Sequence, residues 1–227
     1  MKSFKNQQSG FTLVEIAIVL VIIGLLLGGV LKGQELINSA KVKSYAQDFR
    51  VIQSAMYGFQ DRFKGIPGDL PGAGGAGGKL GATATTASTP ANQLGNSRID
   101  GAWDTLTATD ESCLVWQHLR LANFMSGNTT ANCAVGDPYL QSNADGGRIG
   151  MSSTMYIIGM TGSYNICSTG VLGKIAKQLD TQLDDGISDT GSFRFTAAAA
   201  PPATTGATAT PPTSVDDGAS YTVCLSF

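Results

Sequence analysis

The chain has 227 residues, a formal net charge of −2 at pH 7 and only 14% charged residues, against about 25% in an average soluble domain. This length leaves room for one domain of ordinary size beside a single membrane-length segment. The sequence contains no basic stripe of the kind that follows a phosphate backbone, so it does not support direct nucleic-acid binding by this chain.

An apolar run occupies residues 11–31, where Thr12 and Glu15 are the only polar residues. A helix of this length measures about 31 Å and matches a hydrocarbon core of about 30 Å. An ionised carboxylate in such a core costs several kcal/mol unless it finds a partner. The run therefore predicts either an anchor helix with its acid at the headgroup level or a helix whose acid has a specific partner.

The polar flank before this run favours the second interpretation. A secretory signal has a shorter apolar stretch, with its small-residue cleavage site after that stretch. Here the small residue, Gly10, precedes the apolar run. Cleavage between Gly10 and Phe11 would give Phe11 a free amine with an ordinary pKa of about 7.7–8.0. That cation would supply the counter-charge for Glu15.

The stretch "SGFTLVEIAIVLVIIGLLL" resembles the N-terminus of type IV pilins and of type II secretion pseudopilins. The resemblance implies that residues 1–10 are a leader, that a prepilin peptidase cuts after Gly10, and that Phe11 becomes N-methylated. It further implies that Glu15 pairs with the Phe11 amine of a neighbouring subunit. The resemblance covers about the first 60 residues. Pilins commonly have a helix-breaking proline farther along this span, and this chain has none there.

The resemblance also implies partners and a location. The expected partners are other copies of the chain or related pilins in a helical filament, the prepilin peptidase, the inner-membrane assembly machinery, and the lipid bilayer before assembly. The expected location is the inner membrane for the precursor and the subunit reservoir, and then a cell-surface or periplasmic filament.

The helical pattern continues past the membrane-spanning residues 11–32 and becomes amphipathic over residues 33–64. Apolar residues recur at steps of three and four, which is the spacing of one helix face: Val42, Tyr45, Phe49, Ile52, Met56, Phe59 and Phe63. We expect Gly65 to form a left-handed cap and Pro67 to prevent continuation. The alternative is a break near Gly33 between an anchor and a separate helix.

Three glycines, Gly24, Gly28 and Gly29, lie inside the apolar run. Glycine costs about 1 kcal/mol relative to alanine in a helix, so this stretch is the expected weak point. The same residues would also allow close packing between neighbouring helices, or would simply be tolerated in lipid.

Residues 65–227 are expected to form an extracytoplasmic globular domain. Two low-complexity segments, residues 72–102 and 197–214, read as long loops. We expect a helix to begin at Asp110, to have an apolar face and to end at Gly127. A further helix is expected over residues 171–186, with strands over residues 154–160, 192–196 and 220–227. The predicted fold class is α+β: a pilin-like roll in which one long N-terminal helix packs on a small antiparallel sheet, with extra helices and long loops.

The chain has four cysteines, Cys113, Cys133, Cys167 and Cys224, and no pair has C-x-x-C spacing. Outside the cytoplasm two disulfides are the default, and four cysteines allow three connectivities. We favour 113–133 and 167–224, because each pair brackets a locally coherent block. The chain-entropy estimate for these loops is about 3 and 4 kcal/mol.

The densest acidic cluster comprises Asp180, Asp184, Asp185 and Asp189. Its carboxylates and loop carbonyls suit calcium, which some pilin-like proteins bind, although the spacing does not fit an EF-hand. An Asp-Asp-Gly helix end that needs no metal is the competing interpretation. No other cofactor is expected.

We expect no catalytic residues, because the single histidine, His118, has no second histidine and no nucleophile motif beside it. The resemblance of the N-terminus implies a structural subunit of a type IV pilus or a related pilin-like filament. One alternative is a type II secretion pseudopilin or minor pilin. Another is a membrane-anchored binding protein or enzyme with a pilin-like N-terminus.

Overall fold

The structure is a computed structural model, and it describes residues 12–197 and 206–227. The predicted cleavage site, Gly10 and Phe11, lies outside the described residues. The chain divides into two compact units, residues 1–40 and residues 41–227. The expected boundary between membrane-spanning and amphipathic segments, at residue 32, therefore precedes the division between the units.

Helix α1 runs without interruption from Leu13 to Phe63, a length of 51 residues. The alternative of a break near Gly33 is wrong, because Gly33 and the three glycines before it are all helical. An 18-residue window of α1 has a mean hydropathy of 2.8, and none of the window is buried. Among the described residues, α1 is the one helix long and apolar enough to cross a membrane.

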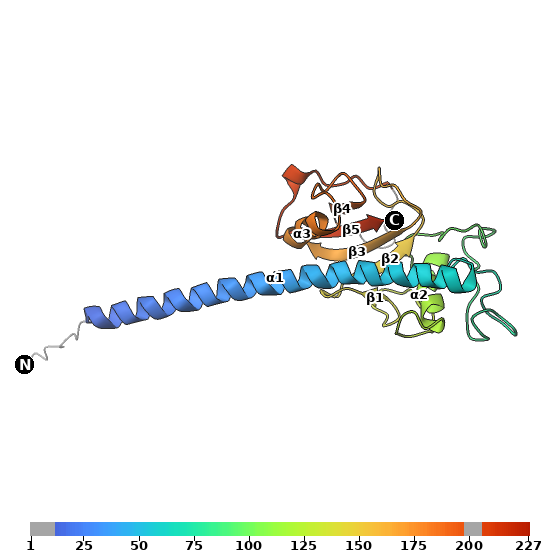
Figure 1. The fold of residues 1–227 in the computed structure, drawn as a ribbon, viewed down its shortest axis with the longest axis horizontal. Coiled ribbons are helices and arrows are strands. Elements are labelled where there is room, and N and C mark those ends of the chain that lie inside the picture. The colour runs from blue at the N-terminus through green and yellow to red at the C-terminus, as the bar shows by residue number, and fades with distance from the viewer. Residues whose placement is uncertain (1–11, 198–205) are drawn as a thin grey trace, which may run out of the picture. The chain divides into compact units, whose positions relative to one another are not determined.

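The globular unit contains one five-stranded antiparallel sheet in the order β1-β2-β3-β5-β4. Its strands are β1 (Gln141–Ser142), β2 (Arg148–Ser152), β3 (Asn165–Leu172), β4 (Phe193–Ala197) and β5 (Ser220–Ser226). Figure 1 shows β5, the last strand of the chain, between β3 and β4. The predicted α+β class and small antiparallel sheet are therefore confirmed.

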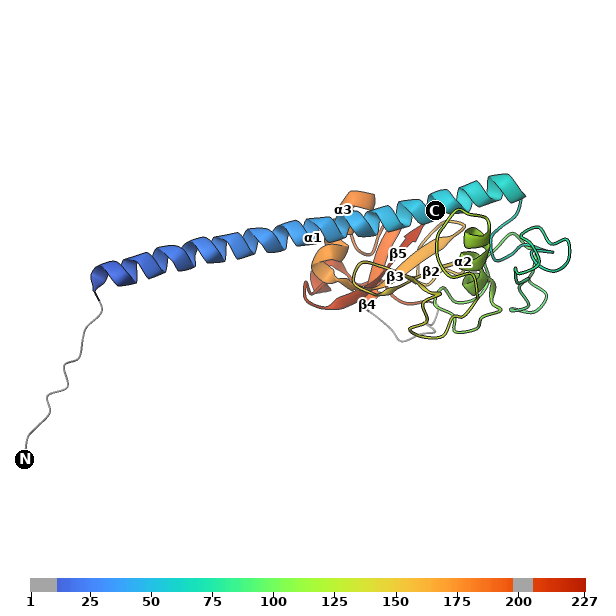
Figure 2. The same ribbon diagram turned by 90° about the horizontal axis from the view of Figure 1, so that it is seen from below.

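The second half of α1 covers one face of this sheet (Figure 2). Its buried side chains follow the predicted steps of three and four and include Val42, Tyr45, Phe49, Ile52, Met56 and Phe59. Phe49 meets Phe193 of β4 edge to face, with ring centroids 6.0 Å apart. The helix pattern read from the sequence is thus the pattern of the core.

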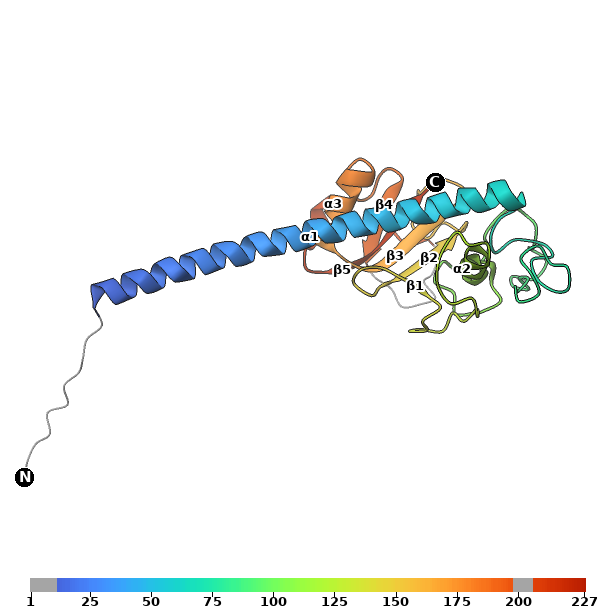
Figure 3. The same ribbon diagram turned by 60° about the horizontal axis from the view of Figure 1, so that its bottom comes forward.

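Helix α2 (Glu111–Leu121) begins directly after Asp110, as predicted, but ends before Gly127. Every residue from Glu111 to Arg120 is buried, so α2 has no solvent-exposed face over that stretch. Arg120 finds backbone partners in this environment: its Nη1 donates to the carbonyl oxygens of Asn128 and Tyr139, at 2.8 and 2.7 Å. Figure 3 shows loop segments passing around α2, and the helix also meets α1, where Phe59 stacks on His118 with ring centroids 6.4 Å apart.

Helix α3 (Gly173–Leu183) and a short 3-10 turn, η1 (Pro212–Ser214), complete the regular structure. The strand predicted over residues 154–160 is wrong: this segment is a turn with one isolated bridge, between Ile157 and Ala207. Its apolar side chains Tyr156, Ile157 and Met160 are buried in a small second core, together with Trp103. Burial explains the apolar run without a strand.

The end of α1 also differs from the prediction. The left-handed residue is Lys64, with φ 49°, and Gly65 does not have a positive φ. A methyl group on Gly65 would lie 2.6 Å from Leu70 Cδ1. A larger residue at position 65 would therefore require the buried Leu70 side chain to move, and Gly65 does not form the cap itself.

Candidate functional site

The described part of the N-terminal motif centres on Glu15, in the first turn of α1. Thr12 immediately precedes the helix, and its backbone N–H donates to Glu15 Oε2 at 2.9 Å. The Thr12 hydroxyl donates to the same oxygen at 2.7 Å and accepts from the Glu15 N–H at 3.3 Å. This reciprocal arrangement is a capping box, which satisfies two of the free N–H groups at a helix start. Thr12 was not among the predicted site residues, although Thr-x-x-Glu before an apolar run is the signature of this cap.

The helix around Glu15 exposes a continuous apolar surface. Leu13 is 91% exposed, and nine large apolar side chains after it have exposed fractions from 46% to 74%: Val14, Ile16, Ile18, Val19, Leu20, Val21, Ile22, Ile23 and Leu25. Monomeric soluble proteins rarely expose a contiguous apolar surface of this kind, and its usual occupants are lipid or another protein. Glu15 is the one carboxylate in this surface.

Comparison with known proteins assigns this segment to a class. Residues 5–31 match the family described as the prokaryotic N-terminal methylation motif. This is the leader motif of type IV pilins and pseudopilins, and the match supports a type IV pilin-like or pseudopilin protein. No curated protein matches the chain.

Both favoured disulfides are confirmed. Cys167 and Cys224 are directly opposite each other on β3 and β5, with Cα atoms 4.1 Å apart. This crosslink ties the C-terminal strand to the middle of the sheet. Beyond it, β3 has an irregular register between Ser168 and Val171, where Gly170 adopts φ 77°.

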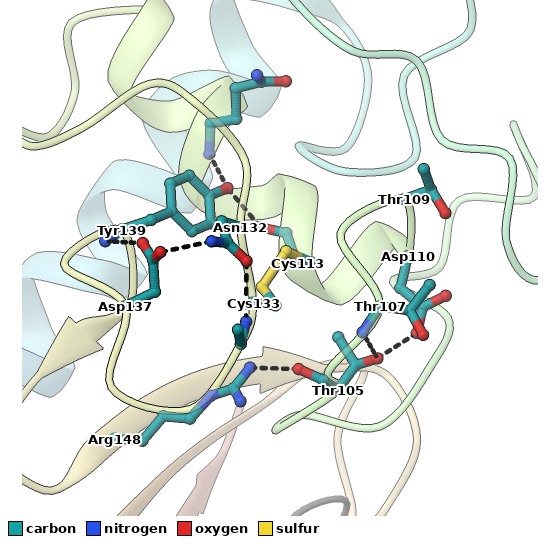
Figure 4. Close-up of a disulfide and its surroundings, with 12 residues drawn as sticks. Thr105, Thr107, Thr109, Asp110, Cys113, Asn132, Cys133, Asp137, Tyr139 and Arg148 are labelled. Carbon is teal, nitrogen blue, oxygen red and sulfur yellow. Dashed lines mark hydrogen bonds between the residues drawn. A yellow bond between two sulfur atoms is a disulfide. The ribbon is translucent and has the colours of Figure 1, made fainter.

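The second disulfide joins Cys113 of α2 to Cys133 in the loop that follows (Figure 4). Tyr139 lies beside it, and its hydroxyl donates to the Cys113 carbonyl oxygen at 2.7 Å and accepts from the Gln117 N–H at 2.9 Å. Asp137 accepts from the Tyr139 N–H at 2.8 Å and orders the same loop. The crosslink and this network hold the loop against α2.

His118 has a structural environment rather than a catalytic one. Its Nδ1 accepts from the Gly68 N–H at 2.8 Å, and its Nε2 lies 2.8 Å from the Thr85 carbonyl oxygen. The side chain is fully buried, and burial lowers its pKa from 6.5 to about 4. A neutral ring with both nitrogens occupied connects two segments of the long loop before α2.

The structure brings together three of the four aspartates considered for calcium. Oxygen atoms of Asp180, Asp184 and Asp185 all lie within 4.8 Å of one another. Asp189 is in the same loop but is not a member of this group. Asp180 is 1% exposed, whereas the other two lie nearer the surface.

Proposed function

We propose that the chain is a structural, non-catalytic subunit of a type IV pilus or a related pilin-like filament. In this proposal a peptidase cuts after Gly10, Phe11 is N-methylated, and the mature subunit leaves the inner membrane to join a surface or periplasmic filament. The observation that carries the proposal is the methylation motif at residues 5–31, directly followed by an unburied apolar helix.

The apolar surface of α1 supplies attraction between subunits but little register. Lipid tails are as apolar as leucine, so helices in a membrane gain little from hydrophobic burial alone. A charge pair is directional, and an unpaired carboxylate in that environment costs several kcal/mol. A subunit therefore gains most at the axial offset that places its Glu15 beside the cationic N-terminus of a neighbour.

The capping box is compatible with this role. Thr12 occupies one oxygen of Glu15, Oε2, and no hydrogen bond within the described residues engages Oε1. A carboxylate has two oxygens and about four acceptor sites. Glu15 can therefore keep its cap on Thr12 and accept a second donor, the amine of a neighbouring Phe11.

The test compares filament yield from Glu15→Gln and Glu15→Ala with that from Glu35→Gln. Glu35 belongs to the same helix, is exposed, and pairs with Lys32 at 2.6 Å, so it is a matched control for loss of one negative charge. We expect all three variants to be cut, and both Glu15 variants to lose filaments while Glu35→Gln retains them. Normal filaments from Glu15→Gln alone would refute charge pairing as the source of register.

Filament location distinguishes the alternatives within this class. Abundant chain in sheared surface filaments is the result expected of a major pilin. Trace amounts in such filaments, or a strictly periplasmic assembly, would instead identify a minor pilin or a pseudopilin. A processed chain that never enters a filament would favour the membrane-anchored binding protein.

A further inference from the structure

We propose that residues 95–100 form a pH-sensitive strap, which two buried carboxyl groups fasten to the rest of the globular unit and which opens locally as the pH rises through neutrality. The carboxyl groups belong to Asp69, in the loop after α1, and to Glu111, in the first turn of α2. The inference does not depend on filament assembly. It rests on the hydrogen bonds of the strap, on its backbone conformation and on the charges around Glu111.

Side chains, rather than a helix or a strand ladder, hold the two ends of the strap. Asp69, which is 2% exposed, accepts hydrogen bonds from the N–H groups of Gly95 and Ser97, the second at 2.7 Å. Glu111 Oε2 accepts from the Asp100 N–H at 2.8 Å. The strap itself lies outside every helix and strand. Two acids from separate elements therefore fix the beginning and the end of one short segment.

The middle of the strap combines a strained residue with a buried one. Ser97 has φ 65°, in the left-handed region that residues other than glycine rarely adopt. Such a conformation costs free energy and persists only where its surroundings hold it. Ile99 is fully buried; its N–H donates to Ser153 Oγ at 2.9 Å, and its carbonyl oxygen accepts from the Ser153 N–H at 2.8 Å. Opening of the strap would therefore release backbone strain and expose one apolar side chain.

Glu111 is a buried acid among other acids. It is 1% exposed, and its Oε1 has no hydrogen-bond partner among the described residues. The titratable and charged groups around Glu111 and the strap are Asp69, Asp100, Asp110, Arg98, Tyr164 and His118. Within this group Arg98 is the one permanent cation; it pairs with Asp100 at 3.6 Å, and its side chain is 55% exposed. Ionised Glu111 therefore faces three carboxylates and one cation that solvent screens.

The charge of Glu111 changes across neutral pH. Burial raises its pKa from 4.5 to about 7, and the three neighbouring aspartates act in the same direction. Burial also raises the pKa of Asp69 and of Tyr164, and it lowers that of His118 from 6.5 to about 4, so both rings stay neutral near pH 7.

The direction of the response follows from the two states of Glu111. In an open strap Glu111 reaches water, where its pKa returns to the ordinary 4.5. Between pH 4.5 and pH 7 the closed state therefore holds a proton that the open state has lost. The closed strap is most stable below pH 4.5, and this advantage is lost as the pH rises through about 7.

Native amide hydrogen exchange of the full chain in detergent, at pH 5.5 and pH 8, tests the proposal. The informative amides are those of Gly95, Ser97 and Asp100, with rates corrected for the intrinsic pH dependence of exchange. The two pKa values of Glu111 predict that the opening constant rises by up to about 30-fold between these pH values. Protection of the three amides should fall by up to the same factor. Equal protection at both pH values in the wild type would overturn the proposal.

Low concentrations of urea distinguish local opening from global unfolding. Local opening exposes little surface, so exchange in the strap should hardly respond to urea. Exchange at the centre of β5, which pairs with both β3 and β4, should accelerate with urea because it requires global unfolding. Strap amides with the protection and the urea dependence of β5 would show that the strap has no opening of its own and would contradict the inference.

Two variants assign the response to Glu111. Glu111→Gln keeps an acceptor for the Asp100 N–H and removes the ionisation, so it should lose most of the pH response. Asp61→Asn is the matched control: it removes one negative charge from the exposed end of α1, where Asp61 pairs with Lys64 at 2.9 Å, and it should keep the full response. Equal responses from the two variants would overturn the proposal. If Glu111→Gln does not fold, the pH and urea dependences of the wild type decide the question.

Discussion

Replacement of Glu111 by glutamine should stabilise the globular unit at alkaline pH and have little effect near pH 4.5. Glu111 is 1% exposed, and its Oε2 accepts from the Asp100 N–H at 2.8 Å. Burial raises its pKa from 4.5 to about 7, and the charges of Asp69, Asp100 and Asp110 act in the same direction. Glutamine keeps an oxygen for the Asp100 N–H and removes the ionisation.

Proton binding to Glu111 sets the direction in which stability changes with pH. Between pH 4.5 and pH 7 the folded state holds a proton on Glu111 that the unfolded state has lost, so the free energy of unfolding falls as pH rises through this window. The difference between a pKa of 4.5 in the unfolded chain and about 7 in the folded chain corresponds to a loss of about 3 kcal/mol in the free energy of unfolding, complete above pH 7. At pH 8 the free energy of unfolding of Glu111→Gln should therefore exceed that of the wild type by up to about 3 kcal/mol.

The difference between variant and wild type is more informative than the wild-type profile alone. Burial lowers the pKa of His118 from 6.5 to about 4, so its contribution to stability is lost as pH falls through this window, opposite to the effect of Glu111. We would measure urea unfolding of the full chain in detergent at pH 4.5, 6 and 8 by the fluorescence of the buried Trp103 and Trp116. Glu35→Gln, a change at an exposed glutamate, is the matched control. A Glu111→Gln effect of equal size at pH 4.5 and pH 8 would refute the reasoning.

Three further predictions follow from named contacts. Cys167→Ser with Cys224→Ser should lower the free energy of unfolding by about 4 kcal/mol, measured by urea unfolding; an unchanged midpoint would show that the β3–β5 pairing alone holds the C-terminal strand. His118→Leu should cost about 2–5 kcal/mol, because the Gly68 N–H and the Thr85 carbonyl oxygen lose their partner, and native amide exchange should accelerate at Gly68; unchanged exchange there would contradict the contact. Thr12→Ala should weaken the start of α1 by about 1 kcal/mol, visible as faster amide exchange in the first turn in detergent micelles, whereas Thr12→Ser should behave as the wild type; equal exchange in both variants would argue against the capping box.

Local periodicity was sufficient to predict α1 and its contacts. The spacing from Val42 to Phe59 identifies one helix face, and that face is the one buried on the sheet. The terminal strands β4 and β5 were also predictable, because alternation and β-branched or aromatic residues are local signals. Pairing of Cys167 with Cys224 followed from their positions at the ends of one block, and their direct opposition on β3 and β5 explains it.

The remaining elements depend on contacts that local patterns do not contain. Strand β3 includes polar residues and Gly170, and it is central because β2 and β5 pair with it on both sides. Helix α2 has buried polar residues such as Gln117, whose side chain bonds the Thr85 N–H and the Thr129 carbonyl oxygen at 2.8 Å each. Residues 154–160 have the composition of a strand, but they form a turn whose apolar side chains pack with the Cys167–Cys224 disulfide. Each case is decided by residues far away in the sequence.

The candidate site was predictable where a short motif carries the chemistry. Glu15 follows from an acid within an apolar run, and Thr12 could have been found from the Thr-x-x-Glu cap signature. The burial of Asp180 could not, because a helix pattern with leucines on one face does not show which neighbouring aspartate faces the body. The separation of Asp189 from the other three depends on the turn after α3, which is set by hydrogen bonds such as that from the Phe193 N–H.

Mass spectrometry of the mature N-terminus tests the central claim most directly. The chain purified from membranes of its native host should begin at Phe11, with one methyl group on the α-amine, and should lack residues 1–10. The Gly10→Val variant should keep all ten residues and stay in the membrane. A mature chain that retains residues 1–10, or one cut elsewhere in or after the apolar run, would contradict the assignment of this protein as a processed pilin-like subunit.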